Sequence, residues 1–192
     1  MPMNWELEEN IRLTTPRLVL RPLTVGDDDA MYALIAHDRD VLRYFIMPYA
    51  EERSGFTMER SIEACRAGKK HILALVEKET DEVCGMMLMC SAPNPVFNAC
   101  EVGYALGRKF QRRGLCAEAL KAFTEYLFSK GVHKVFCACI AENTASRRVM
   151  EKCGMMYEGT RKDEIFYRGR YWDTDVFYRL APEHGEPSSV QP

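Results

Sequence analysis

Gln111-Arg112-Arg113-Gly114-Leu115-Cys116-Ala117 is the stretch that decides the fold, because it joins a strand-like run ending at Leu106 directly to an amphipathic helix. Backbone N–H groups at the start of a helix have no partner inside the helix, and the aligned peptide dipoles place partial positive charge there. Phosphate is therefore the natural ligand of such a turn. Arg108 and Lys109 add positive charge on its approach, and Gly114 lets the backbone come close to a ligand. A purely structural junction explains the segment equally well when it is taken in isolation.

Length and composition bound the class of protein. The 192 residues, 47% of them hydrophobic and 28% charged, suffice for one complete core and are few for two independent domains. We therefore expect one domain over residues 11–180, followed by a disordered tail over residues 181–192, which is polar and rich in Pro, Ser and Glu. The net charge of -2 and the pI near 6.1 argue against binding to nucleic acid or to an anionic membrane.

The eight cysteines are scattered through expected core segments, and the N-terminus shows no signal-peptide pattern. We therefore expect free thiols and a cytoplasmic protein. No CxxC spacing occurs and the four histidines show no metal spacing, so we expect no metal site. The apolar run over residues 135–141 is far shorter than the about 20 residues needed to cross a bilayer, which predicts a soluble protein.

Periodicity predicts a mixed order of strands and helices. Strands are expected at residues 17–21, 72–76, 83–89, 101–106, 135–140, 155–161 and 171–180. Helices are expected from the capping pair Thr24 and Asp27 to Ile35, at residues 56–67 before Gly68, from Cys116 to Gly131, and from Asn143 to Gly154. The three middle strands form an antiparallel meander. The strand at 135–140 is reached through a helix and is apolar throughout, so it should lie parallel to its predecessor and be covered on both faces.

Four blocks of sequence, in one order, carry a resemblance to a known family. They are Arg17-Leu18-Val19-Leu20-Arg21-Pro22, Glu101-Val102-Gly103-Tyr104, Gln111 to Ala119, and Asn143-Thr144-Ala145-Ser146 followed by Glu151-Lys152-Cys153-Gly154. From about residue 11 to residue 180, the chain resembles the RimJ/RimL-like branch of the GNAT superfamily of acyl-CoA-dependent N-acyltransferases. The resemblance implies an α+β fold: a mixed, mostly antiparallel sheet of about seven strands, flanked by helices. The strands at 101–106 and 135–140 would splay apart into a wedge for the cofactor.

The chemistry implied by the resemblance is transfer of an acetyl group from acetyl-CoA to a primary amine, by direct attack in a ternary complex. The amine must lose a proton, the tetrahedral oxyanion must meet an N–H donor, and the departing thiolate benefits from a proton donor. Glu101 is the expected base, the Leu106 N–H the oxyanion donor and Ser146 the acid. The alternatives are an ordinary ion pair for Glu101 and helix capping for Ser146.

The resemblance also implies where acetyl-CoA binds. The expected cofactor-binding residues are Tyr104, Leu106, Gln111, Arg112, Arg113, Gly114, Leu115, Cys116, Ala117, Asn143 and Ser146. Pantetheine would pair like an added strand with the backbone near Tyr104 and Leu106. Asn143 either binds the pantetheine amide, caps a helix, or does both. Cys116 departs from the family motif, which has Gly or Ala there, and we expect its thiol to point into the helix packing stripe.

A second hypothesis is a non-catalytic acyl-CoA-binding or regulatory module with the same fold. A P-loop NTPase is a poor third, because Gly114 is not followed by the Lys and Ser/Thr that hold phosphate and magnesium. The acceptor amine is open between ribosomal-protein or other peptide N-termini and small amines. The segments expected to select it, residues 44–56 and 163–171, have the weakest periodicity. Monomer and dimer are equally compatible with the sequence.

Overall fold

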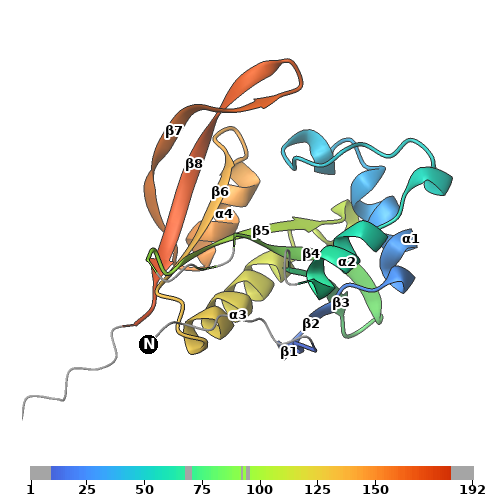
Figure 1. Ribbon diagram of the computed structural model, residues 1–192, viewed down its shortest axis with the longest axis horizontal. Helices are drawn as coiled ribbons and strands as arrows, with labels where there is room; N and C mark the ends of the chain where they lie inside the picture. Colours follow the sequence, from blue (N-terminus) through green and yellow to red (C-terminus); the bar gives the residue numbers. More distant parts are fainter. Residues whose placement is uncertain (1–9, 68–70, 92, 94–95, 183–192) are drawn as a thin grey trace, which may run out of the picture.

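One sheet of eight strands organises the described part of this computed structural model, which comprises residues 10–67, 71–91, 93 and 96–182. Its order is β1-β2-β3-β4-β5-β6-β8-β7, and every neighbouring pair is antiparallel except β5 and β6 (Figure 1). The strands are β1 (Leu13–Thr14), β2 (Leu18–Pro22), β3 (His71–Glu77), β4 (Glu82–Ser91), β5 (Ala99–Leu106), β6 (Lys134–Ile140), β7 (Met156–Tyr167) and β8 (Arg170–Leu180). The expected mixed, mostly antiparallel sheet is confirmed. The additional strand, β1, is too short for alternation to predict.

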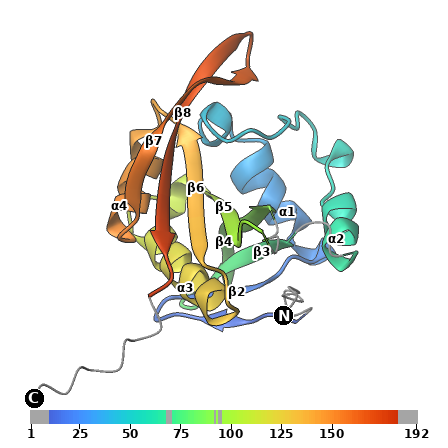
Figure 2. The same cartoon turned by 60° about the vertical axis from the view of Figure 1, so that its left-hand side comes forward.

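Helices cover both faces of the sheet, with α3 and α4 packed on one face and α1 and α2 on the other (Figures 1 and 2). The helices are η1 (Val25–Asp27), α1 (Asp28–Met31), η2 (Tyr32–Ala36), η3 (Val41–Arg43), η4 (Arg53–Gly55), α2 (Glu59–Arg66), η5 (Arg108–Phe110), α3 (Leu115–Ser129) and α4 (Thr144–Lys152). Gly131 and Gly154 follow α3 and α4 with φ of 88° and 73°, as expected for residues that end helices.

The helix expected after Thr24 forms, but it is irregular. The Asp27 carboxylate accepts hydrogen bonds from the backbone N–H and the hydroxyl of Thr24, at 2.8 and 3.0 Å. Arg21 donates to the same carboxylate at 2.7 and 2.8 Å, which ties the start of this helix to β2. After η1 and α1, the His37 N–H bonds to the Tyr32 carbonyl at 2.9 Å, and this wider turn makes η2 a π-helix. The apolar stripe in the sequence predicts an ordinary helix there.

The parallel pair β5 and β6 splays apart, as expected. The two strands pair only through Ala99↔Lys134, Cys100↔Val135 and Glu101↔Phe136. Beyond these pairs, β5 continues along β4 to Leu106, whereas β6 continues along β8 to Ile140. The strands thus diverge and enclose a wedge, whose sides are seen as the separating β5 and β6 ribbons in Figure 1.

The expectation that β6 is covered on both faces holds for one face and only in part for the other, where Ile140 at the end of the strand is buried. Val135, Cys137 and Cys139 are buried on the face covered by α3 and α4. Phe136 and Ala138, which point to the other face, are only half-buried. On that face the apolar cluster under α1 and α2 draws on β3, β4 and β5 and includes no residue of β6. An unbroken apolar run therefore overstates the cover of a strand beside a wedge.

All eight cysteines are free thiols, as expected. No helix among the described residues is long and apolar enough to span a bilayer. Gly68, expected to end the second helix, and the tail from residue 183 onward lie outside the described residues.

Gly85 in β4 provides a test of the β4–β5 contact. A Cβ added there would lie 2.2 Å from the Ala105 carbonyl oxygen and 2.9 Å from the Leu106 Cα, so the backbone of β5 would have to shift. We expect Gly85→Ala to lower the free energy of unfolding by about 1–3 kcal/mol in urea denaturation. Gly159→Ala in β7 is the matched control, because no heavy atom lies within 4 Å of its added Cβ. Equal losses in the two variants would contradict the close packing of β4 on β5.

Candidate functional site

The turn between β5 and α3 has the geometry of an anion site. Arg112 and Gly114 adopt the left-handed region, with φ of 61° and 80°, and α3 begins at Leu115. The N–H of Glu118 is the first to bond back along the helix, to the Gly114 carbonyl at 3.1 Å. The N–H groups from Gly114 to Ala117 therefore have no acceptor within the helix. The sequence-based prediction of an exposed helix start at this place is correct.

Arg17 braces this turn from the far end of the chain. Its Nη1 donates to the Arg113 carbonyl at 2.8 Å, and its Nε donates to Glu118 at 2.7 Å. Glu118 also accepts from the Thr15 hydroxyl at 2.6 Å. Partial burial would raise the pKa of Glu118, but the bonds from Thr15 and Arg17 hold that pKa below its usual value. The carboxylate nearest the helix start is thus neutralised by Arg17. Sequence reasoning missed this role, although Arg17 opens the first block of the family resemblance.

The remaining side chains of the turn stabilise it. The Gln111 amide donates to the Leu106 carbonyl at 3.0 Å, and Arg113 forms an ion pair with the buried Glu77 carboxylate. Cys116 is 8% exposed and lies in the core beneath α3, where burial raises the pKa of its thiol far above the usual range. The expectation that this thiol points into the packing stripe is confirmed. It is neither a reactive thiolate nor an obstacle in the turn.

The edge of β5 that faces the wedge presents main-chain groups. The Gly107 N–H bonds across to the Cys84 carbonyl of β4 at 3.0 Å. Because N–H directions alternate along a strand, the N–H and C=O groups of Tyr104 and Leu106 point the other way, into the wedge. Gln111 reaches the Leu106 carbonyl from that side. Among the described residues, no strand pairs with this part of the β5 edge.

Tyr104 and Ser146 meet on the face of the sheet covered by α3 and α4. The two hydroxyl oxygens are 2.8 Å apart, and the Tyr104 hydroxyl also donates to the Ser146 carbonyl at 3.2 Å. The Asn143 Oδ1 accepts from the Ser146 N–H at 3.1 Å, so Asn143 caps α4. The capping alternative therefore holds for Asn143 and is wrong for Ser146. Burial raises the pKa of Tyr104 well above its usual value, which keeps its phenol protonated. Sequence reasoning named Tyr104 for its backbone and missed this side-chain contact.

Glu101 points to the opposite face of the sheet, because it is three residues from Tyr104 on an alternating strand. Burial raises the pKa of Glu101, the nearby Arg161 lowers it and the nearby Glu164 raises it further. Arg161 and Glu164 form an ion pair of 2.8 Å on β7, and the Thr174 hydroxyl of β8 donates to Glu164. No cation among the described residues forms an ion pair with Glu101. The alternative that Glu101 forms an ordinary ion pair is therefore wrong.

Comparison with known proteins agrees with this geometry. The acetyltransferase (GNAT) domain model matches residues 17–156. The [ribosomal protein uS5]-alanine N-acetyltransferase of Escherichia coli (strain K12) is 26% identical over 192 residues, covering 90% of this chain and 92% of the relative.

Two solved structures share the fold. One is the RimL ribosomal L7/L12 alpha-N-protein acetyltransferase in complex with coenzyme A, which forms a disulfide with a cysteine. It superposes with a TM-score of 0.77 at 20% identity, and the match covers 88% of this chain and 98% of the RimL chain. The spermidine N-acetyltransferase of Vibrio cholerae, in complex with CoA and spermine, superposes with a TM-score of 0.74 at 21% identity. The match covers 87% of this chain and 97% of that enzyme. Because the family model matches residues 17–156, well over half of the sequence, the chain belongs to the GNAT acetyltransferase family.

Proposed function

We propose that this protein transfers an acetyl group from acetyl-CoA to a primary amine, which attacks the thioester directly in a ternary complex. The observation that carries the proposal is the wedge between β5 and β6, with a carboxylate of raised pKa on one face and a pair of hydroxyl groups on the other. The uS5-alanine N-acetyltransferase and the two coenzyme A complexes support it.

We also propose that residues 11–180 form one domain that works in the cytoplasm, where its free thiols stay reduced.

Main-chain groups would bind the donor. The N–H groups from Gly114 to Ala117 would receive the diphosphate, and the open β5 edge at Tyr104 and Leu106 would pair with the pantetheine arm. The Leu106 N–H would then face the oxyanion that forms from the thioester carbonyl. The fit is supported by the buried Cys116 thiol and the neutralised Glu118, since neither opposes an anion at the turn.

Proton transfer would use both faces of the sheet. Glu101 would take the proton from the attacking amine, and a raised pKa makes a carboxylate a better proton acceptor. Ser146 would donate its hydroxyl proton to the departing thiolate on the opposite face. The hydroxyl pair allows either direction of donation. When the single Tyr104 hydroxyl proton turns from the Ser146 carbonyl to the Ser146 Oγ, the Ser146 proton would be free for the sulfur, and the phenol would stabilise the oxygen as that proton leaves. Asn143 would act by fixing the first turn of α4.

The direct test is amine-dependent release of free thiol from acetyl-CoA, with peptides, polyamines and aminoglycosides as acceptors. We expect turnover with the native protein, and about 10²-fold lower kcat for Ser146→Ala because a proton donor to the thiolate is lost. Coenzyme A affinity of the variant should stay within about twofold in calorimetry. Donor binding with no amine-dependent release across the panel would instead support the non-catalytic module.

The pH dependence tests Glu101 as the base. A base must be ionised, so kcat/KM falls as pH drops through the pKa of Glu101, and the raised pKa places this acid limb above that of an ordinary glutamate. Glu164→Gln removes a repelling charge, which lowers the pKa of Glu101 and should move the limb to lower pH. Arg161→Gln removes an attracting charge and should move it to higher pH. Shifts in one direction for both variants, or an unchanged limb in Glu101→Gln, would exclude Glu101.

Arg17→Gln tests the brace of the anion turn. The variant loses charge-assisted bonds to Arg113 and Glu118 and leaves the Glu118 carboxylate unpaired beside the helix start. We expect coenzyme A to bind about tenfold more weakly in calorimetry, with kcat at saturation unchanged. Arg12→Gln removes the same charge from an exposed position and should bind as the native protein does. Unaltered affinity in Arg17→Gln would show that the turn needs no brace.

A further inference from the structure

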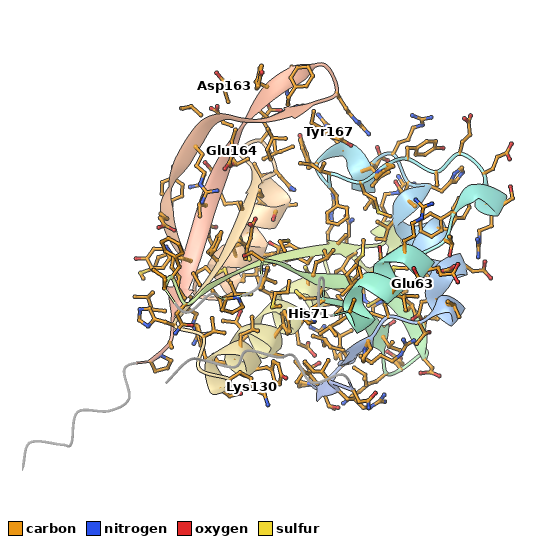
Figure 3. All side chains as sticks on the ribbon, in the orientation of Figure 1. Glu63, His71, Lys130, Asp163, Glu164 and Tyr167 are labelled. Atoms are coloured by element: carbon orange, nitrogen blue, oxygen red, sulfur yellow. The ribbon has the colours of Figure 1, made fainter. Side chains whose placement is uncertain are left out.

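The β7–β8 hairpin meets the η3 segment in a closed ring of contacts, which we call the aromatic junction. The Tyr167 hydroxyl donates to the Leu42 carbonyl at 3.1 Å, and Figure 3 shows Tyr167 pointing from the hairpin toward that segment. The Tyr44 ring meets the Trp172 ring edge-on, with centroids 6.3 Å apart. The Trp172 Nε1 donates to the Tyr167 carbonyl at 2.8 Å, which completes the ring. Two segments far apart in sequence are thus held together by their side chains.

Each aromatic ring of the junction carries an arginine. The Arg43 guanidinium lies 5.1 Å from the Tyr44 ring centroid, that of Arg168 lies 5.2 Å from Tyr167, and that of Arg170 lies 3.3 Å from Trp172. A guanidinium that lies over an aromatic ring retains N–H groups for hydrogen bonds. Arg170 already donates to Glu142, so Arg43 and Arg168 are the two whose N–H groups remain suited to carboxylate oxygens.

The junction borders the face of the sheet where Glu101 lies. Glu164, beside Glu101, is bonded to Thr174 of β8. Trp172 is two residues from Thr174 on the same strand, so their side chains share one face. The hairpin face that approaches Glu101 therefore continues to Trp172 of the junction. A hollow of about 240 Å³ lies beside Trp172 and is lined by Ile140, Ala141, Glu142, Tyr171, Trp172 and Asp173. Because Tyr104 and Ser146 occupy the other face, an amine that reaches Glu101 passes this side.

The acidic side chains around the junction are already paired. The pairs are Asp38 and Asp40 with Arg108, Glu142 with Arg170, Glu164 with Arg161, and Asp173 with Lys162. Figure 3 shows Asp163 on the outer side of the hairpin, away from Tyr167. Arg43 and Arg168, by contrast, are exposed and form no ion pair with any residue in the described ranges. The mouth of the acceptor face therefore has two cations without a local counter-charge.

We propose that the acceptor is a peptide N-terminus with an acidic residue a few positions behind its amine, and that Arg43 and Arg168 bind this carboxylate. The inference rests on the proposed N-acetyltransferase activity and names its substrate class. A polyamine carries several ammonium groups, which two unpaired guanidinium groups would repel. A peptide amine placed at Glu101 would extend back over the hairpin, where a carboxylate behind the amine would meet the exposed guanidinium groups of Arg43 and Arg168. The charge pattern thus selects an acidic peptide over a polyamine.

The experiment uses matched peptides that differ only by Asp or Glu against Asn or Gln behind the N-terminal residue, with spermidine as the polyamine. We expect the acidic peptide to have the highest kcat/KM, with the difference residing in KM and shrinking at high salt. Arg43→Gln and Arg168→Gln should each raise KM for the acidic peptide about two- to fivefold, leaving kcat and the amide peptide unchanged. Arg12→Gln, which removes the same charge near β1 at the opposite edge of the sheet, should change neither.

Equal kcat/KM for the acidic and amide peptides, or a preference for spermidine, would overturn the inference while leaving acetyl transfer intact. An equal loss for both peptides in Arg43→Gln or Arg168→Gln would also overturn it, since it would show a structural role for the arginines. Absence of amine-dependent thiol release with every acceptor would refute the proposed function, and the inference with it. The two failures are therefore distinguishable.

Discussion

The early end of the parallel ladder between β5 and β6 is the constraint on which the rest of this structure depends. Main-chain N–H and C=O groups are costly to leave without partners, so two neighbouring strands separate only when something else holds them. Here β4 holds β5 along its length to Leu106, and β8 holds β6 from Lys134↔Leu180 to Ile140↔Thr174. Each inner strand follows its outer neighbour, and the sheet divides. The wedge is thus enforced by antiparallel pairing on both sides and needs no ligand to open it.

Strand alternation then gives the two faces of the wedge different chemistry. Glu101 and Tyr104 lie on one short strand but point to opposite faces, so the carboxylate and the partly buried phenol lie on either side of one strand without meeting each other. Beside Glu101 itself this face has Arg161 and Glu164 of the hairpin as neighbours, and the carboxylate is half-buried there. The other face is sealed by α3 and α4, which places the Ser146 hydroxyl against Tyr104. One alternating strand therefore separates the Glu101 carboxylate from the pair of hydroxyl groups.

Sequence reasoning recovered what local periodicity encodes. Alternation and helical spacing locate the later strands and helices, and the helix between β5 and β6 predicts their parallel direction correctly. What it missed depends on contacts between distant residues: the Arg17 brace crosses 101 positions to Glu118, and Ser146 meets Tyr104 across 42. The sequence pattern also failed where two nearby residues could each play the same local role. Asn143 and Ser146 are both good capping residues, and only the bond from the Ser146 N–H to Asn143 shows which of them caps.

The difference between local pattern and distant contacts also explains why the sequence reveals the proposed donor site more fully than the proposed acceptor site. The groups suited to bind a diphosphate and a pantetheine arm are main-chain groups at a helix start and a strand edge, which do not depend on side-chain identity. Cys116 can therefore replace a smaller residue while its thiol turns into the core. The hairpin supplies the charged groups beside Glu101, and the bond from the Tyr167 hydroxyl to the Leu42 carbonyl joins this hairpin to η3 across 125 positions. The weak periodicity of residues 44–56 and 163–171 does not indicate this contact, because η3 lies just before the first range and β7 continues to Tyr167 in the second. The contact arises only when the fold brings the two segments together.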